Sequence, residues 1–220
     1  GQLSAGIAHE LNNPLGVVVM YANILLDEVP EDSELADDLK LIVEQTNRCK
    51  NIVGGLLNFA RKNQVNRSEI DVYKLLEQSF DAVIVPDRVE VVKDTENLSK
   101  SEVSLDQEQM TQILSNLIKN AIDAMPDSGT LTVKVEDDDQ YVNFTVSDTG
   151  KGIKKEERDK IFEPFYTTKG IGKGTGLGLA TAYGIVKMHN GKITVDSNTD
   201  PDAGPTGTKF TIKIPNQKEK

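Results

Sequence analysis

Two asparagines and an aspartate recur on one face of a helix that the apolar spacing predicts at residues 106–125. At about 100° per residue, Asn116, Asn120 and Asp123 fall on one polar stripe, while the apolar residues fall on another. Asparagine is a poor helix former, so helix propensity gives no reason for the pair at positions 116 and 120. Amide oxygens suit Mg²⁺, which is bound by a few protein oxygens together with phosphate and water. Taken alone, the stripe has a second interpretation as a solvated helix face.

A carboxylate and two glycines follow a predicted strand. The sequence Asp-Thr-Gly-Lys-Gly occupies residues 148–152, directly after the strand ends. Gly150 and Gly152 would let the backbone approach a ligand closely. Asp148 could accept a hydrogen bond from the exocyclic amine of adenine. By itself this pattern indicates only a turn, so its meaning depends on the segments around it.

A glycine-rich segment comes next in the chain. Residues 170–178 contain five glycines, whose amides could cradle phosphates. A helix predicted to begin near Gly176 would direct its N-terminal dipole at the same anion, and Lys169 and Lys173 add positive charge. The glycines match neither the Gly-x₄-Gly-Lys-Ser/Thr P-loop nor a dinucleotide-binding strand–turn–helix unit, so neither of those sites is indicated.

A histidine near the N-terminus is placed where another domain could approach it. In the first predicted helix, His9 lies about opposite the apolar seam, and Ala5, Asn13 and Gly16 surround it on the outer face. A glycine within a helix costs up to about 1 kcal/mol relative to alanine, so Gly16 indicates a need for open space. A lone helical histidine is more commonly an inert surface residue, and the small neighbours are what favour a chemical role.

The first 65 residues are predicted to form the two helices that carry this histidine. Pro30 stops the first helix and Ser33 caps the second. The second helix has an apolar seam whose spacings alternate between four and three residues, which is a heptad pattern. Its members are Leu35, Leu39, Ile42, Thr46, Cys49, Val53, Leu56 and Ala60. The first helix has a similar apolar seam at Ile7, Leu11, Pro14, Val18, Tyr21 and Leu25. Two helices cannot bury this seam alone, so we expect the hairpin to dimerise into a four-helix bundle.

From about residue 66 the pattern changes to strands that alternate with helices. Strands are predicted at residues 89–92, 131–135, 141–146, 192–195 and 209–214, and helices near residues 71–84, 106–125 and 176–189. This order predicts helices packed on one sheet. A polar segment at residues 63–68 marks the boundary, so we assign residues 1–65 to the hairpin and residues 66–220 to the second domain. The fold class is α+β, a helical hairpin followed by an α/β sandwich.

Two reactive side chains are predicted to be structural. Cys49 lies on the heptad seam, where we expect a small core residue. His189 ends a predicted helix, where a histidine can contact the final carbonyl groups.

The overall composition limits the classes of partner. The net charge of −10 argues against nucleic acid, because binding a phosphate backbone requires a basic surface. Between Lys151 and Lys173, however, seven Lys or Arg face four Asp or Glu, which fits a small polyanion. No apolar run approaches the roughly 20 residues of a membrane helix, so we expect no membrane contact in this fragment, although the full-length protein could be membrane-bound. One cysteine cannot form an internal disulfide, which favours the cytoplasm.

These blocks, in this order, resemble the ATP-binding domain shared by histidine kinases, gyrase, Hsp90 and MutL. The resemblance runs from about residue 66 to residue 215 and includes the Phe-rich segment at residues 162–169 before the glycine lid. It implies that Asn120 binds Mg²⁺, that Asn116 lies near the phosphates, that Asp148 anchors adenine and that Thr208 supports the adenine-bound water network. The other residues assigned to this site are Asp123, Gly150, Gly152, Lys169, Gly174, Gly176 and Gly178.

Residues 8–15, Ala-His-Glu-Leu-Asn-Asn-Pro-Leu, resemble the H-box of sensor histidine kinases and are most similar to the nitrogen-regulation branch. The resemblance implies that His9 accepts the γ-phosphoryl group of ATP and that Glu10 accepts or orients the imidazole proton. It also implies that Asn13 positions a water for dephosphorylating a partner. The expected function is autophosphorylation of a homodimer, followed by transfer to an aspartate of a response regulator.

Other functions are weighed against this one. The same residues fit a core that mainly dephosphorylates its response regulator, and they fit an interaction module that binds ATP only as a conformational switch. A serine-directed kinase with the same ATP fold is disfavoured, because such kinases lack a preceding hairpin with a His-Glu box.

Overall fold

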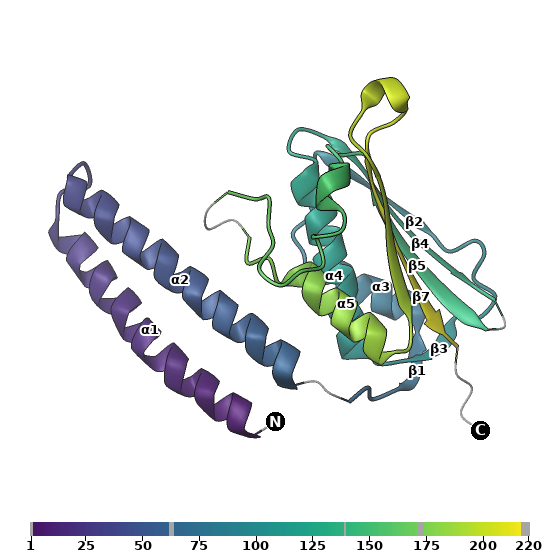
Figure 1. Ribbon diagram of the computed structural model, residues 1–220, viewed down its shortest axis with the longest axis horizontal. Helices are drawn as coiled ribbons and strands as arrows, with labels where there is room; N and C mark the ends of the chain where they lie inside the picture. The colour runs from purple at the N-terminus through teal and green to yellow at the C-terminus, as the bar shows by residue number, and fades with distance from the viewer. Residues whose placement is uncertain (1, 62–63, 139, 171–173, 217–220) are drawn as a thin grey trace. The chain divides into compact units, whose positions relative to one another are not determined.

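The computed structural model describes residues 2–61, 64–138, 140–170 and 174–216 (Figure 1). Side chains in these ranges are described except at residues 2–10, 48, 51–52 and 54–61. The chain divides into two compact units. The helical unit comprises the residues up to 63 together with Glu163–Leu177, and the sheet unit comprises Gln64–Phe162 together with the residues from Gly178 onward. Each unit is described by itself.

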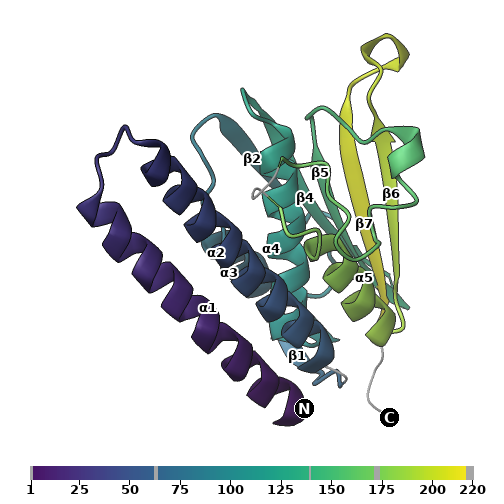
Figure 2. The ribbon, with the colours of Figure 1, turned by 60° about the vertical axis from the view of Figure 1, so that its left-hand side comes forward.

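Two long antiparallel helices dominate the helical unit. Helix α1 spans Gln2–Glu28 and α2 spans Glu34–Arg61, and they lie side by side in Figures 1 and 2. Pro30 lies in the turn between them. The Ser33 hydroxyl accepts a hydrogen bond from the amide of Ala36 at 3.1 Å and donates one to the carbonyl of Pro30 at 2.7 Å. The predicted proline stop and serine cap are therefore confirmed.

The hairpin buries a different stripe from the predicted seam. The α1 residues that turn inward are Leu15, Val19, Ala22 and Leu26, and those of α2 are Ala36, Leu39, Val43, Thr46, Lys50 and Val53. The predicted α1 seam is left uncovered by α2, because Leu11, Pro14, Val18, Tyr21 and Leu25 are exposed, as expected of a seam that two helices cannot bury alone. The α2 seam is divided, since Leu35, Ile42 and Cys49 are exposed. A pair of helices covers only a narrow stripe of each, so a wider apolar face remains outside, and Cys49 is not a core residue of this hairpin.

A five-stranded sheet forms the frame of the sheet unit. Its order is β2 (Val89–Asp94), β4 (Gly129–Asp137), β5 (Tyr141–Asp148), β7 (Gly207–Pro215) and β6 (Lys192–Asn198). Strands β2 and β4 are parallel, and the remaining neighbours are antiparallel. All five predicted strands are confirmed. A second sheet, which the sequence did not indicate, pairs β1 (Ser68–Asp71) with β3 (Glu102–Leu105).

Three helices cover one face of the five-stranded sheet (Figures 1 and 2). They are α3 (Val72–Asp81), α4 (Gln107–Ala124) and α5 (Gly178–Met188), close to the predicted bounds. Two short 3₁₀ turns lie at Lys155–Glu157 and Pro201–Ala203. In β4, the residues Leu131, Val133 and Val135 are buried and alternate with half-buried neighbours, and Ile113 and Leu117 of α4 are fully buried. The strand period of two and the helix period of 3.6 thus place their apolar faces in one core.

Within the described residues, no helix is both long and apolar enough to cross a membrane.

Candidate functional site

Asp148 ends β5 with its carboxylate half-buried. Its Oδ1 accepts hydrogen bonds from the amide of Gly150 at 2.9 Å and from the amide of Thr208 at 3.3 Å. Burial raises the pKa of Asp148 above its ordinary value, and the two backbone amides oppose that rise. Both bonds engage Oδ1, so Oδ2 is the oxygen that can accept a hydrogen bond from a ligand.

The two glycines after Asp148 are required by the protein backbone around them. A Cβ on Gly150 would collide with the carbonyl of Ala124, and the amide of Lys151 donates to that same carbonyl at 3.2 Å. Gly152 has a φ of +73°, and a Cβ there would collide with the carbonyl of Asn198. The sequence analysis expected the backbone at these glycines to approach a ligand. In the structure it approaches the C-terminal end of α4 and the end of β6, and these contacts fix the loop that holds Asp148.

Thr208 faces Asp148 across the β5–β7 pair and Ser197 across the β6–β7 pair. Ser197 Oγ donates to the carbonyl of Gly207 at 2.7 Å, lies 3.0 Å from Thr208 Oγ1 and accepts from the amide of Ile153 at 2.8 Å. The hydroxyl of Ser197 is used on Gly207, so Thr208 is the donor between the two hydroxyls. Thr208 is 5% exposed, which matches a residue that supports a site from behind. No sequence pattern pointed to Ser197, which is one polar residue in a half-exposed strand.

Arg158 fastens the segment that leaves the Asp148 loop. Its guanidinium donates to the carbonyl of Ser197, and its Nε donates to the carbonyl of Ile153 at 3.3 Å. The sequence predicted only a local excess of positive charge in this region. The structure shows that at least this cation binds the protein's own backbone, so the local charge is not all available to an anionic ligand.

The polar stripe of α4 lies at the same end of the sheet unit as the Asp148 loop. Asn116 and Asn120 are half-buried and Asp123 is exposed, as the helical period predicts. The Asn116 amide donates to the carbonyl of Gly178 at 3.4 Å, which brings the start of α5 beside the stripe. A Cβ on Gly178 would lie 3.6 Å from the Asn116 amide, an ordinary contact distance.

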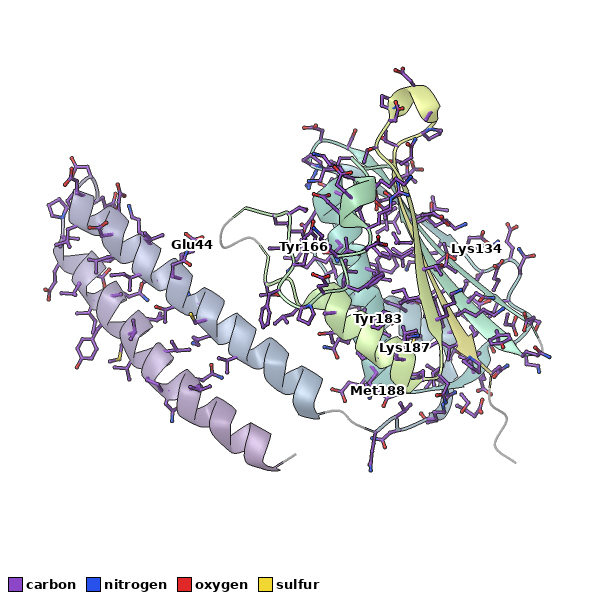
Figure 3. The ribbon with its side chains drawn as sticks, in the orientation of Figure 1. Glu44, Lys134, Tyr166, Tyr183, Lys187 and Met188 are labelled. Carbon is purple, nitrogen blue, oxygen red and sulfur yellow. The ribbon has the colours of Figure 1, made fainter. Side chains whose placement is uncertain are left out.

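The first phenylalanine of the Phe-rich segment is anchored in the sheet unit. The Phe162 ring lies 5.4 Å from the ring of Tyr183 in α5 and 6.4 Å from that of Phe210 in β7. Lys187 places its Nζ 5.3 Å from the centre of the Tyr183 ring, and both side chains extend from α5 in Figure 3. The glycine segment therefore leaves the sheet unit from a fixed aromatic cluster.

The glycine segment belongs to the helical unit and is closed at its base. The amide of Phe165 donates to the carbonyl of Gly176 at 2.9 Å, and both residues have positive φ, +69° and +67°. Gly174 lies against Thr167 and Lys169. Residues 171–173, which include the predicted contact Lys173, lie outside the described residues.

His9 and Glu10 lie in α1, but their side chains are outside those described. Asn13, one turn further along, is exposed, and a Cβ added at Gly16 would meet nothing within 4 Å. The outer face of α1 is therefore open at both described positions that the sequence placed near His9.

Comparison with known proteins finds two family models on the chain. Residues 1–65 match the family model described as His Kinase A (phospho-acceptor) domain, and residues 105–218 match the one described as Histidine kinase-, DNA gyrase B-, and HSP90-like ATPase. The chain is 35% identical over 232 residues to "Sensor kinase CckA" of Brucella abortus (strain 2308), covering 98% of this chain and 24% of that protein. It thus spans well under two thirds of the length of this relative.

Solved structures show the same fold. "Crystal structure of ShkA full-length in complex with AMPPNP" has a TM-score of 0.73 at 24% identity and covers 100% of this chain and 47% of that one. The histidine kinase ThkA in complex with the response regulator protein TrrA has a TM-score of 0.66 at 24% identity, covering 99% and 62%. The match over residues 105–218 shows that the chain belongs to the histidine kinase-, DNA gyrase B- and HSP90-like ATPases, and residues 1–65 match a His Kinase A (phospho-acceptor) domain.

Proposed function

We propose that this chain binds Mg-ATP in its sheet unit, transfers the γ-phosphoryl group to His9, and passes it to an aspartate of a response regulator. The observation that carries the proposal is the half-buried Asp148 carboxylate, whose Oδ1 is held by two backbone amides beside the asparagine stripe. A phospho-acceptor family match at residues 1–65 supplies the other half of the reaction.

Adenine recognition is assigned to Asp148 and Thr208. The 6-amino group of adenine donates to Asp148 Oδ2, while Gly150 and Gly152 hold the loop against α4 and β6. Because the carboxylate is desolvated, a donor from the ligand satisfies it better than the apo protein does. The Thr208 hydroxyl, fixed by Ser197, supports this hydrogen bond from behind.

The triphosphate is assigned to the region where α4 meets the start of α5. The N-terminal dipole of α5 at Gly178 attracts anions, and Asn116 lies beside it. Asn120 is the residue that would hold Mg²⁺, whose remaining ligands would come from the nucleotide and water, since no cluster of three or more His, Cys, Asp or Glu occurs among the described residues. Bound there, Mg²⁺ neutralises phosphate charge. The lid residues Lys169, Gly174 and Gly176 are assigned to closure over the triphosphate, and Asp123 to the polar edge of the site.

Phosphoryl transfer needs a neutral imidazole, which is the main form of an unperturbed histidine at neutral pH. A ring nitrogen of His9 forms a bond to the γ-phosphorus while the bond from that phosphorus to the bridging oxygen breaks, and ADP leaves. The other ring nitrogen then releases its proton to Glu10. Asn13 is assigned to the opposite reaction, dephosphorylation of the response regulator, in which it positions a water against the phospho-aspartate.

A second copy of the chain is proposed to cover the exposed stripe of the hairpin. In both helices the exposed apolar stripe is offset from the inward stripe by roughly 70° in the same rotational sense. Because the helices are antiparallel, this places Leu11, Val18 and Leu25 of α1 on the same side of the hairpin as Leu35 and Ile42 of α2. One continuous apolar face of this kind is self-complementary about a two-fold axis and closes a four-helix bundle.

The partner that receives the phosphoryl group is proposed from the ThkA complex, in which a related kinase fold is bound to a response regulator. A cytoplasmic location fits the single cysteine and the intracellular substrate ATP.

Labelling with γ-³²P-ATP tests the proposal. The wild type is expected to acquire an acid-labile, alkali-stable label, because phosphohistidine has this stability. His9→Gln removes the acceptor and Asn120→Ala removes the metal ligand, so both are expected to reduce labelling to background. Asn143→Ala, on β5, is the matched asparagine control and should label normally. The chain has two histidines, and the other is the fully buried His189. Labelling that persists in His9→Gln would contradict the assignment.

A further inference from the structure

The segment at residues 64–67 is held on the sheet unit by a partly buried polar network. Gln64, Asn66 and Arg67 each contribute a backbone or side-chain group to it, and all three belong to the sheet unit. We refer to residues 64–67 as the linker and to its contacts as the linker clamp. The proposed function uses none of these contacts.

Asp106 serves two elements at once. As the N-cap of α4, its Oδ1 accepts a hydrogen bond from the amide of Gln109 at 3.0 Å. Its Oδ2 accepts from the amide of Asn66 at 2.9 Å. An N-cap needs only one side-chain oxygen, so the second oxygen of this buried carboxylate is committed to the linker.

Gln109 adds a second tie on the first turn of α4. Its side chain is 1% exposed, and its Nε2 donates to the carbonyl of Gln64 at 3.1 Å. Burying a primary amide costs stability unless it is hydrogen-bonded, and the linker supplies the partner of Nε2, while Oε1 is buried without a hydrogen-bond partner among the described residues. Gln107, two residues earlier, binds Gln78 of α3 instead, at 2.7 Å.

Arg67 completes the clamp from the linker side. Its guanidinium donates to the carbonyls of Ser104 at 2.8 Å, His189 at 3.0 Å and Pro215 at 3.4 Å. The carbonyl of His189 lies just beyond the C-terminal end of α5, where a cation is favoured by the helix dipole. Desolvation lowers the pKa of Arg67, and its three carbonyl acceptors hold the charged form in this partly buried place.

His189 joins the two helix ends within the same network. Its Nε2 accepts from the amide of Asp106 at 3.4 Å, which requires Nδ1 to carry the proton that is shared with the carbonyl of Ile185 at 3.0 Å. Burial lowers the pKa of His189, in agreement with this neutral form. The predicted structural role of His189 at its helix end is confirmed.

The clamp and the nucleotide site occupy opposite ends of the same helices. Helices α4 and α5 pack side by side (Figures 1 and 2). Asp106 and His189 lie together at one end of the pair. At the other end of α4, Ala124 contacts the loop after Asp148, and the other end of α5, at Gly178, lies beside Asn116 near the middle of α4. The 18 residues of α4 give a rigid arm about 27 Å long between the two.

We propose that Arg67, Asp106 and Gln109 are positioning residues for phosphotransfer, which hold residues 64–67 fixed against the sheet unit. The proposal rests on the proposed function. A clamped linker keeps four residues of the chain that leads to His9 in one conformation on the sheet unit. A loose linker adds freely rotating bonds and lowers the effective concentration of the nucleotide at His9.

Asp106→Asn in the full chain is the main test. The asparagine Oδ1 still caps α4, but Nδ2 replaces the oxygen that accepts from Asn66. We expect the rate of His9 phosphorylation at saturating Mg-ATP to fall about fivefold, with the dissociation constant for Mg-ATP unchanged. Asp71→Asn is the matched control, because Asp71 caps α3 with Oδ1 alone, accepting from Tyr73 and Lys74. Gln109→Leu with Gln107→Leu as its control, and Arg67→Met, should repeat the pattern.

A second measurement separates the failure of this proposal from failure of the proposed function. Hydrogen exchange of the Asn66 amide should be slow in the wild type and in Asp71→Asn, and fast in Asp106→Asn. Absence of label on wild-type His9 would overturn the proposed function. A labelled wild type with an unchanged rate in Asp106→Asn, or with rate and nucleotide affinity lowered together, would overturn only the positioning role.

Discussion

At the scale of single residues, the half-buried carboxylate of Asp148 lowers the stability of the protein without ligand, and a bound ligand that donates a hydrogen bond offsets this loss. Burial raises the pKa of this carboxyl, so its charged form is disfavoured in the folded protein. The native state therefore binds the proton more tightly than the unfolded chain does. The charged form reduces stability at neutral pH, and this penalty disappears as the pH falls through the raised native pKa.

Asp148→Asn is expected to weaken nucleotide binding while leaving the apo protein as stable as the wild type or more so. The asparagine Oδ1 keeps the bonds from Gly150 and Thr208, but its amide nitrogen opposes the amino group of adenine. We expect a loss of about 100-fold in affinity, or about 3 kcal/mol, measured by displacement of a fluorescent ATP analogue. The gain in thermal midpoint over the wild type should be largest at neutral pH and vanish in acid.

Asp138→Asn is a control in which the pKa of the carboxyl is shifted in the opposite direction. Amides of Gln140 and Tyr141 lower the pKa of this exposed carboxyl, so the charged form is favoured in the folded protein. Its substitution should slightly lower the thermal midpoint at neutral pH without changing nucleotide affinity. A fall in affinity of similar size in both variants would contradict the role given to Asp148.

At the scale of the element, Gly16 lowers the stability of α1 and leaves open space for the nucleotide to approach His9. A Cβ there meets nothing within 4 Å, so Gly16→Ala creates no clash within the hairpin. We expect a stability gain of about 0.5–1 kcal/mol from helix propensity, seen as a higher thermal midpoint. We also expect phosphorylation of His9 to slow by about threefold or more, because the added methyl occupies the approach face.

Asn23→Ala is the control for this substitution. Asn23 is exposed on the same helix, and replacing it should give a similar gain in helix stability. It lies about 20 Å along the axis from His9, beyond the approach of the phosphate. Equal rates for Gly16→Ala, Asn23→Ala and the wild type would show that Gly16 does not serve access.

Sequence reasoning identified the long, strongly periodic elements and missed the short ones. The five strands of the main sheet and helices α3 to α5 have enough residues for their periods to be read. Strands β1 and β3 have four residues each, and their pairing joins positions such as Ile70 and Val103 that are far apart in the chain. No local pattern can report such a pairing.

The residues of the site divide in the same way. Asn116, Asn120 and Asp148 could be named because their residue types are unusual for their elements. Ser197 and Arg158 could not, because their partners come from the register of β6 against β7 and from the path of a loop. The seam could be identified for the same reason, but periodicity reveals only an apolar face and not which half of it the other helix of the hairpin covers.

At the scale of the whole molecule, the uncovered half of the hairpin face predicts assembly. Ile42→Glu places an acidic side chain on the stripe shared with Leu35 and Cys49. Because the interface is two-fold symmetric, it would contain one such charge from each copy. Burying an unpaired carboxylate costs several kcal/mol, so the variant should be monomeric. Sedimentation equilibrium should show twice the chain mass of 24.1 kDa for the wild type and a single chain mass for the variant.

Leu41→Glu is the control for assembly. Leu41 is also exposed and apolar, but it lies about 100° around α2 from Ile42, outside the stripe. This variant should remain dimeric. Alkylation of Cys49 gives an independent readout, slow in the wild type and in Leu41→Glu and fast in Ile42→Glu. Rapid alkylation of a dimeric wild type would place the interface elsewhere.

The linker clamp also determines where this protein can be cut and recombined. Residues 64–67 precede the first strand of the sheet unit, yet their partners lie on α4, after α5 and at the end of β7. A chimera that exchanges the hairpin for another input module should therefore be spliced before Gln64. Splicing after Arg67 would separate the guanidinium from its three carbonyl acceptors and leave the second oxygen of Asp106 facing a foreign segment.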